Sequence, residues 1–177
     1  MFIVLYKSLL LVINIKYMLN FLRYWAVTMD IQLTIWLIFV FASLINSVLD
    51  LKTMHISLLV NYLCLGFTVF LCVYQKINII ENIISGILLF FIFLATRRLS
   101  NNGLGMGDVH YSLYCGFLSS VFTSILSALL AALLCLFVFL IIFFINGKSR
   151  IKLLKLPFVP FLFVATVLGN LVTWGIW

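Results

Sequence analysis

The chain has 177 residues, of which 66% are hydrophobic and only 8% are charged. Soluble domains carry about 25% charged and about 45–50% apolar residues, and a soluble fold of this length could not bury so much apolar surface. The composition predicts one membrane-embedded domain and excludes a cytosolic enzyme, a secreted disulfide scaffold, a disordered tail and a nucleic-acid-binding protein. The net charge of +7 is typical of a membrane protein whose Lys and Arg residues gather in cytoplasmic loops.

Residues 1–28 fit a membrane span poorly, because Lys7, Lys16 and Arg23 interrupt the apolar stretch. Three interpretations stay open: an interfacial helix, a poor seventh span, or an upstream extension with Met29 as the working start. The last is slightly favoured. We therefore expect an N-terminal extension over residues 1–28 and a transmembrane domain over residues 29–177.

Six apolar runs follow, each long enough or nearly long enough to cross a hydrocarbon core, which takes about 20 residues of helix. They cover residues 31–49, 56–74, 79–96, 109–125, 126–145 and 157–177. The fourth and fifth runs are almost fused, and the turn between them is expected at Ser119, Ser120, Thr123 and Ser124. The sequence predicts an all-α membrane protein, a bundle of six transmembrane helices, with an extra N-terminal helix over residues 1–28 as an open alternative.

The basic residues alternate between the loops of this expected bundle. The loops after the first, third and fifth runs hold seven Lys and Arg residues, whereas those after the second and fourth hold only Lys76. The positive-inside rule therefore predicts that the odd-numbered loops are cytoplasmic. The alternation also supports six spans, because a missed helix would scramble it.

Only four carboxylates occur, at Asp30, Asp50, Glu81 and Asp108. Asp30 precedes the first run, and Glu81 lies near the N-terminus of the third, where the helix dipole favours an anion. Asp50 ends the first run, at the unfavourable end of the dipole, and membrane depth adds a desolvation cost. The sequence offers it no structural benefit apart from the nearby Lys52, although an ordinary interfacial Asp remains an alternative.

Asp108 follows three glycines at alternate positions, Gly103, Gly105 and Gly107. Such glycines allow positive φ angles and a close approach of the backbone to other groups. The plain structural interpretation is an Asp that caps the next helix after a flexible turn. That interpretation leaves the need for three glycines unexplained.

Two spans separate Asp50 from Asp108, so the chain returns to the same membrane face and both residues lie at its cytoplasmic edge. Two carboxylates that share a site cannot both ionise easily, so one keeps its proton near neutral pH. The ionised partner can take a proton from water while the protonated partner donates to a peptide carbonyl. This is the chemistry of an aspartic protease.

Residues 49–56 (LDLKTMHI) and 105–109 (GMGDV) resemble the two active-site segments of the type IV prepilin peptidase family, which are membrane aspartic proteases of the GxGD type. Residues 155–162 (KLPFVPFL) resemble the segment before the last helix of that family, so the resemblance covers about residues 29–177. Many relatives have Ile-Pro-Asn after the first Asp, where this chain has Ile56-Ser57-Leu58, and a Lys where it has His110. Without the paired cysteines of larger relatives, the chain resembles the short, peptidase-only forms.

The resemblance implies a membrane aspartic endopeptidase that cleaves the leader peptide from prepilin-like precursors (pilin, pseudopilin or flagellin-like) at the cytoplasmic face of the inner membrane. It implies Asp50 and Asp108 as catalytic residues, supported by the loop of Gly103, Gly105 and Gly107. Expected partners are the prepilin-like substrate and the lipid bilayer, without nucleic acid. No CxxC pair and no metal-ligand spacing occurs, so neither a metal nor another cofactor is expected.

Two other functions stay open from the sequence. A small ion-coupled transporter or channel would use Asp50 and Asp108 as a proton relay. A degenerate relative without catalytic activity would act in pilus assembly.

Overall fold

The computed structural model describes residues 31–75, 79–101, 103–146 and 157–174. The chain divides into two compact units, Met1–Ile38 and Phe39–Trp177. Of the first unit, residues 31–38 are described, and they are helical. The predictions for residues 1–28 and for the basic segment 148–155 lie outside the described residues.

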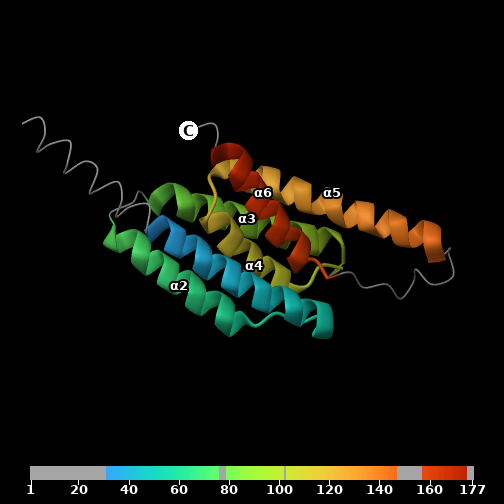
Figure 1. The fold of residues 1–177 in the computed structure, drawn as a ribbon. Helices are drawn as coiled ribbons and strands as arrows, with labels where there is room; N and C mark the ends of the chain where they lie inside the picture. The colour runs from blue at the N-terminus through green and yellow to red at the C-terminus, as the bar shows by residue number, and fades with distance from the viewer. Residues whose placement is uncertain (1–30, 76–78, 102, 147–156, 175–177) are drawn as a thin grey trace, which may run out of the picture. The chain divides into compact units, whose positions relative to one another are not determined.

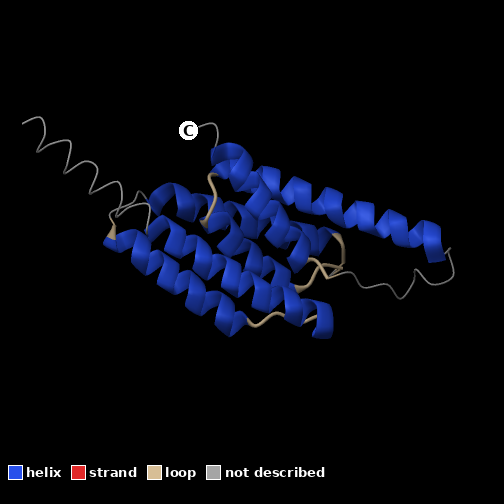
Figure 2. Ribbon diagram, in the orientation of Figure 1, coloured by secondary structure: helices blue, strands red, loops and turns tan. Residues whose placement is uncertain are grey.

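All the regular structure of the described part is helical (Figure 2). A helix over Ile31–Thr53, which carries no label in Figure 1, is called the Asp50 helix below. It is followed by α2 (Leu58–Tyr74), α3 (Ile79–Leu99), α4 (Met106–Phe117), α5 (Val121–Asn146) and α6 (Val159–Trp174). The prediction of an all-α membrane protein is confirmed, and the residues that the structure describes form the six expected helices.

Three helices of the described part are long and apolar enough to cross a membrane: the Asp50 helix, α3 and α5. The shorter helices α2 and α6 are also apolar. Helix α4 has only 12 residues, which at about 1.5 Å per residue is about 18 Å, well short of a hydrocarbon core of about 30 Å. The expected span over residues 109–125 is therefore wrong in length.

The turn that ends α4 lies at residues 118–120, earlier than the expected boundary at residue 125. Ser119 and Ser120 lie in this turn as predicted, whereas Thr123 and Ser124 belong to the first turn of α5. Ser120 Oγ accepts the N–H of Thr123 at 3.3 Å, which is the usual bond of a helix N-cap. The hydroxyl residues therefore mark the start of α5 rather than a longer loop.

Helix α4 is the enclosed helix of the second unit. It packs against α2, α3, α5 and α6, and eight of its 12 residues are buried. Its closest approach is to α3, because a Cβ on Gly116 would lie 2.8 Å from the Cα of Gly86. Small residues permit such close packing of helices in membranes.

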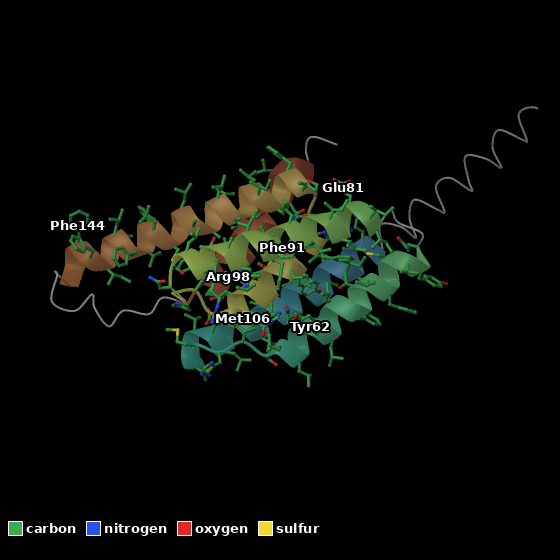
Figure 3. All side chains as sticks on the ribbon, turned by 180° about the vertical axis from the view of Figure 1, so that it is seen from behind. Tyr62, Glu81, Phe91, Arg98, Met106 and Phe144 are labelled. Atoms are coloured by element: carbon green, nitrogen blue, oxygen red, sulfur yellow. The ribbon has the colours of Figure 1, made fainter. Side chains whose placement is uncertain are left out.

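The outer helix faces carry large apolar side chains. Phe67 on α2, Phe91 on α3 and Phe137 on α5 are each more than half exposed, and Phe91 and Phe144 are labelled on the surface in Figure 3. Contiguous apolar surface of this extent is costly in water and is typical of a surface that meets lipid. This is the surface of a membrane protein.

Consecutive helices of the second unit run in alternating directions (Figure 1). Glu81 and Arg98 mark the two ends of α3 (Figure 3). The end that carries Arg98 also holds the last residues of the Asp50 helix and the start of α4, and it contains the pocket described next. The prediction that Asp50 and Asp108 return to the same end of the bundle therefore agrees with the fold.

Candidate active site

One pocket of about 410 Å³ brings the two predicted carboxylates together. It is lined by Asp50, Met54, His55, Ile56, Leu58, Arg97, Gly105, Met106, Gly107 and Asp108. These residues come from the end of the Asp50 helix, the loop after it, the end of α3 and the start of α4. Of the predicted loop glycines, Gly105 and Gly107 line the pocket, while Gly103 lies further back, against Ser100.

Asp50 lies in the last turn of its helix and is only 5% exposed. Its Oδ2 atom accepts the N–H of Val159, the first residue of α6, at 3.1 Å. That N–H has no partner within its own helix, and the positive end of the α6 dipole favours an anion. The structural benefit of Asp50, which is not visible in the sequence, therefore comes from the start of α6.

The segment before α6 leaves this N–H available. The carbonyl of Phe158 accepts the N–H groups of Phe161 and Leu162, both at 3.1 Å, and so begins the helix. Pro160 lies in the first turn, where its missing N–H costs no helical bond. Residues 157–162 thus present the N–H of Val159 to the Asp50 carboxylate.

Asp108 lies in the first turn of α4 and is 9% exposed. Its Oδ2 atom accepts the N–H of Gly105, the N-cap residue, at 3.1 Å. This is the reach-back half of a capping box; Gly105 has no side chain to supply the other half. The interpretation of Asp108 as the N-cap is wrong in position, because Gly105 is the N-cap and Asp108 lies at N3, from where it still binds the start of the helix while it lines the pocket.

The pKa of Asp108 is raised to about 7. Burial is the largest cause, the neighbouring Asp50 charge raises the pKa further, and the hydrogen bond from Gly105 partly offsets both. Burial and like charge both disfavour a second ionised carboxylate in the pocket. Near neutral pH, Asp108 can therefore hold a proton.

Two of the glycines lie in close contacts with side chains of the site. A Cβ on Gly105 would lie 2.9 Å from Asp108 Oδ2, and a Cβ on Gly107 would lie 3.0 Å from Ile56 Cδ1. Close approach was one of the two expected reasons for these glycines. The other, positive φ, is wrong, since Gly105 has φ −63° and neither Gly103 nor Gly107 lies in the left-handed region.

The left-handed conformation instead occurs at Met54, which has φ 56° and lines the pocket. Its N–H donates to the carbonyl of Asp50 at 3.0 Å. A left-handed residue directly after a helix is a common way to end it, although Gly is the usual choice. Met54 thus turns the chain away immediately after Asp50.

Two departures from the family pattern have structural explanations. Ser57 donates its N–H to Asn46 Oδ1 at 3.2 Å and caps α2 by accepting the N–H of Val60 at 3.4 Å. A proline at this position would have no N–H for Asn46. His110 is not among the residues that line the pocket, and its Nδ1 atom shares a hydrogen bond with the hydroxyl of Tyr62.

Arg97 lines the pocket but was not predicted as a site residue. From the sequence it counted only among the seven basic residues that mark the cytoplasmic loops. Its Nη1 atom donates to the carbonyl of Leu104 at 2.8 Å. In the sequence, Ser85, Leu89 and Phe93 precede Arg97 on one face of α3 at four-residue spacing, and only the small Ser85 sets that face apart from the other apolar faces. The three preceding residues are buried, so this face points into the protein.

The cysteines and histidines give no sign of a metal centre in the described ranges, where no three His, Cys, Asp or Glu residues are grouped to hold an ion. All four cysteines are free. Cys72 and Cys115 are buried, and Cys64 and Cys135 are partly exposed. They act as small packing residues.

Residues 33–140 match the sequence profile of the type IV leader peptidase family. The matched range includes Asp50, Asp108 and the three loop glycines, and it ends before α6. Neither a curated protein nor a solved structure gives a match. Because the match covers more than half of the 177 residues, the chain belongs to the type IV leader peptidase family.

Proposed function

We propose that this protein is a membrane aspartic endopeptidase that removes leader peptides from prepilin-like precursors, with Asp50 and Asp108 as its catalytic pair. Membership of the family supports leader peptidase activity. The observation that carries the aspartic type is that two buried carboxylates, from helices far apart in sequence, line one pocket. Among the described residues, no other carboxylate lines that pocket.

The two carboxyl groups take different roles. Asp108 carries the proton, because its pKa is raised to about 7, chiefly by burial. Asp50 is the carboxylate, and the N–H of Val159 at the start of α6 holds one of its oxygens. An acid and a base that differ in environment are the arrangement needed for concerted proton transfer.

In the first step, the oxygen of a water molecule attacks the scissile carbonyl carbon. Asp50 takes a proton from that water, and Asp108 gives its proton to the carbonyl oxygen, which leaves a neutral gem-diol. In the second step the C–N bond breaks. The nitrogen takes the proton from Asp50, and Asp108 recovers a proton from one hydroxyl of the gem-diol. Both carboxyls return to their starting states without a covalent intermediate.

The substrate is a pilin, pseudopilin or flagellin-like precursor in the inner membrane. The pocket lies at the end of the bundle that carries Arg97 and Arg98, which the positive-inside rule assigns to the cytoplasm. The leader reaches the pocket from that side. The apolar helix that follows the leader lies in the bilayer, against the exposed apolar faces of this protein.

Co-expression with a prepilin from the same genome tests the proposal and separates it from the two alternatives. We expect conversion of the prepilin to a shorter product whose new N-terminus is found by mass spectrometry. A transporter would give proton flux in proteoliposomes and no shorter product. Absence of both flux and cleavage, with every prepilin of the genome tried, would favour a degenerate assembly factor.

A further inference from the structure

Arg97 lies in the last turn of α3 and reaches across to the loop before α4. It is half-buried, whereas its neighbours Thr96, Arg98 and Leu99 are exposed. Its guanidinium donates through Nη1 to the carbonyl of Leu104 at 2.8 Å. A charge-assisted hydrogen bond of this length is among the stronger bonds a backbone carbonyl can accept.

The same peptide group contacts Asp108 from its other edge. The carbonyl of Leu104 and the N–H of Gly105 belong to one planar unit, in which they point in opposite directions. Arg97 binds the carbonyl oxygen of this unit. The N–H of the same unit, which belongs to Gly105, donates to Asp108 Oδ2 at 3.1 Å. A single rigid peptide therefore links the guanidinium to the carboxyl.

Other contacts hold the earlier part of this loop, but not that peptide. The N–H of Gly103 donates to the carbonyl of Ser100 at 3.0 Å, and the N–H of Ser100 donates to Thr96 at 2.9 Å. Both bonds lie before Leu104. Among the described residues, Arg97 is the side chain that binds the carbonyl of the Leu104–Gly105 peptide, and its bond sets the orientation in which the N–H meets Asp108.

The charge of Arg97 has no carboxylate of the pocket as a direct partner, since its bond in the described structure is to a carbonyl. A cation bound at the oxygen of an amide polarises it and strengthens the N–H at the other edge as a donor. The guanidinium therefore acts on Asp108 through the peptide.

We propose that Arg97 is a positioning residue, which holds the Leu104–Gly105 peptide so that its N–H fixes Asp108 in the catalytic geometry. The role rests on the proposed function, because the positioned group is the proposed catalytic acid. Arg98, one residue further along the same helix, is exposed and plays no such part.

The role has a consequence for the pH profile. The titratable and charged groups that line the pocket are Asp50, His55, Arg97 and Asp108, and the Cys135 thiol of α5 also interacts electrostatically with Asp108. The bond from Gly105 lowers the pKa of Asp108 against the larger effect of burial. Loss of Arg97 frees the peptide and weakens the bond from Gly105, and this change raises the pKa of Asp108. The alkaline limb of the cleavage profile then moves to higher pH.

The test compares Arg97→Met with the matched control Arg98→Met in the purified full chain, using a prepilin substrate over a range of pH. We expect Arg97→Met to lower kcat by about 10- to 100-fold through misplacement of Asp108, with KM little changed and the alkaline limb moved upward. Arg97→Lys restores a cationic donor and should recover part of kcat. Arg98→Met should match the wild-type protein in both rate and profile.

An unchanged pH profile in Arg97→Met, or equal effects of Arg97→Met and Arg98→Met, would overturn the positioning role. If Arg97→Met does not fold, Arg97→Gln decides, because its shorter and neutral side chain cannot supply the charge-assisted bond: an unchanged pH profile counts against the role. Infrared titration of the Asp108 carboxyl gives a readout without substrate. The titration reports the effect of Arg97 on Asp108 even if the wild-type protein cleaves no prepilin. Absence of cleavage by the wild-type protein would contradict the proposed function, not the positioning role of Arg97.

Discussion

At the scale of single residues, both pocket carboxylates have structural partners in the backbone. Asp50 binds the first N–H of α6, and Asp108 binds the N–H of the N-cap residue of α4. An Asn side chain keeps an acceptor oxygen for each of these bonds but loses the ionisable group. Asn variants therefore separate the proposed chemistry from the structural role.

The titration of Asp108 should depend on Asp50. In the wild-type protein, Asp108 loses its proton as the pH rises through about 7, so cleavage that needs this proton falls on the alkaline side. Replacement of Asp50 by Asn removes the neighbouring negative charge, and the pKa of Asp108 then decreases. It should remain above the ordinary value of 3.8, since burial is the larger cause of the shift.

Infrared titration measures this change through the carbonyl band of the protonated carboxyl, assigned by its loss in Asp108→Asn. Asp50→Asn should shift the midpoint of the band to lower pH. An unchanged midpoint would mean that the two carboxyls do not interact.

Substitution of Gly105 by Ala should impair cleavage without loss of the folded protein. The added Cβ would lie 2.9 Å from Asp108 Oδ2, so the carboxyl must move. We expect a loss of at least about 10-fold in kcat, since small displacements of a catalytic group are costly. Gly66→Ala is the matched control, because no atom lies within 4 Å of its added Cβ. Wild-type kcat in Gly105→Ala would contradict the proposed contact.

The pairing of Asp50 with Asp108 could be predicted from sequence because an even number of spans separates them. A close approach of other groups to Gly105 and Gly107 could be predicted, but the atoms that make the contacts could not. The left-handed residue could not, since Met54 has no sequence signal for φ 56°. Arg97 was missed because apolar residues surround all faces of a membrane helix, and the buried face is marked only by small residues such as Ser85 and Gly86.

At the scale of elements, α4 holds the site in place. The hydroxyl of Tyr111 donates to Ser43 Oγ at 2.7 Å, and the hydroxyl of Tyr114 lies 3.1 Å from Thr68 Oγ1. These buried bonds connect α4 to the Asp50 helix and to α2, which fixes Asp108 relative to Asp50. The length of α4 could not be read from hydropathy, because the apolar run continues into α5 and only hydroxyl residues mark the break.

The packing of α4 on α3 should be sensitive to side-chain size at Gly116. A Cβ there would lie 2.8 Å from both Gly86 Cα and the carbonyl oxygen of Ser85, which are backbone atoms. Overpacking of this kind typically costs about 1–3 kcal/mol, so Gly116→Val should lower the free energy of unfolding and the Tm in detergent. Gly66→Val adds the same side chain to a helix at an open position. Equal Tm changes in the two variants would contradict the close contact.

At the scale of the whole molecule, the alternation of basic loops predicted one end of the bundle as cytoplasmic. The pocket lies at the end of the second unit where Arg97 and Arg98 lie, and Glu81 marks the opposite end of α3. Six helices could be counted from the sequence, but only three of the described helices are long and apolar enough to span. Helix α4 need not be long enough to span the membrane, because its neighbours enclose it.

Topology is testable by cysteine labelling in intact cells. A cysteine placed at Lys52 or Arg98, both exposed, should resist a membrane-impermeant thiol reagent until the cells are opened. A cysteine at Glu81, also exposed at the opposite end of α3, should react from outside. The unsubstituted protein gives the background from its four native cysteines. Labelling of the Arg98 position from outside would reverse the orientation and the placement of the pocket.

The central claim is that Asp50 and Asp108 act together as the catalytic pair, and the most direct measurement is kcat for purified Asp50→Asn, Asp108→Asn and the double variant on one prepilin substrate. Each single variant should lose about 10²–10⁴-fold in kcat. The double variant should lose little more, because the two groups act as a unit. Glu81→Gln, outside the pocket, should cleave at the wild-type rate. Cleavage by Asp108→Asn at the wild-type rate would contradict the account.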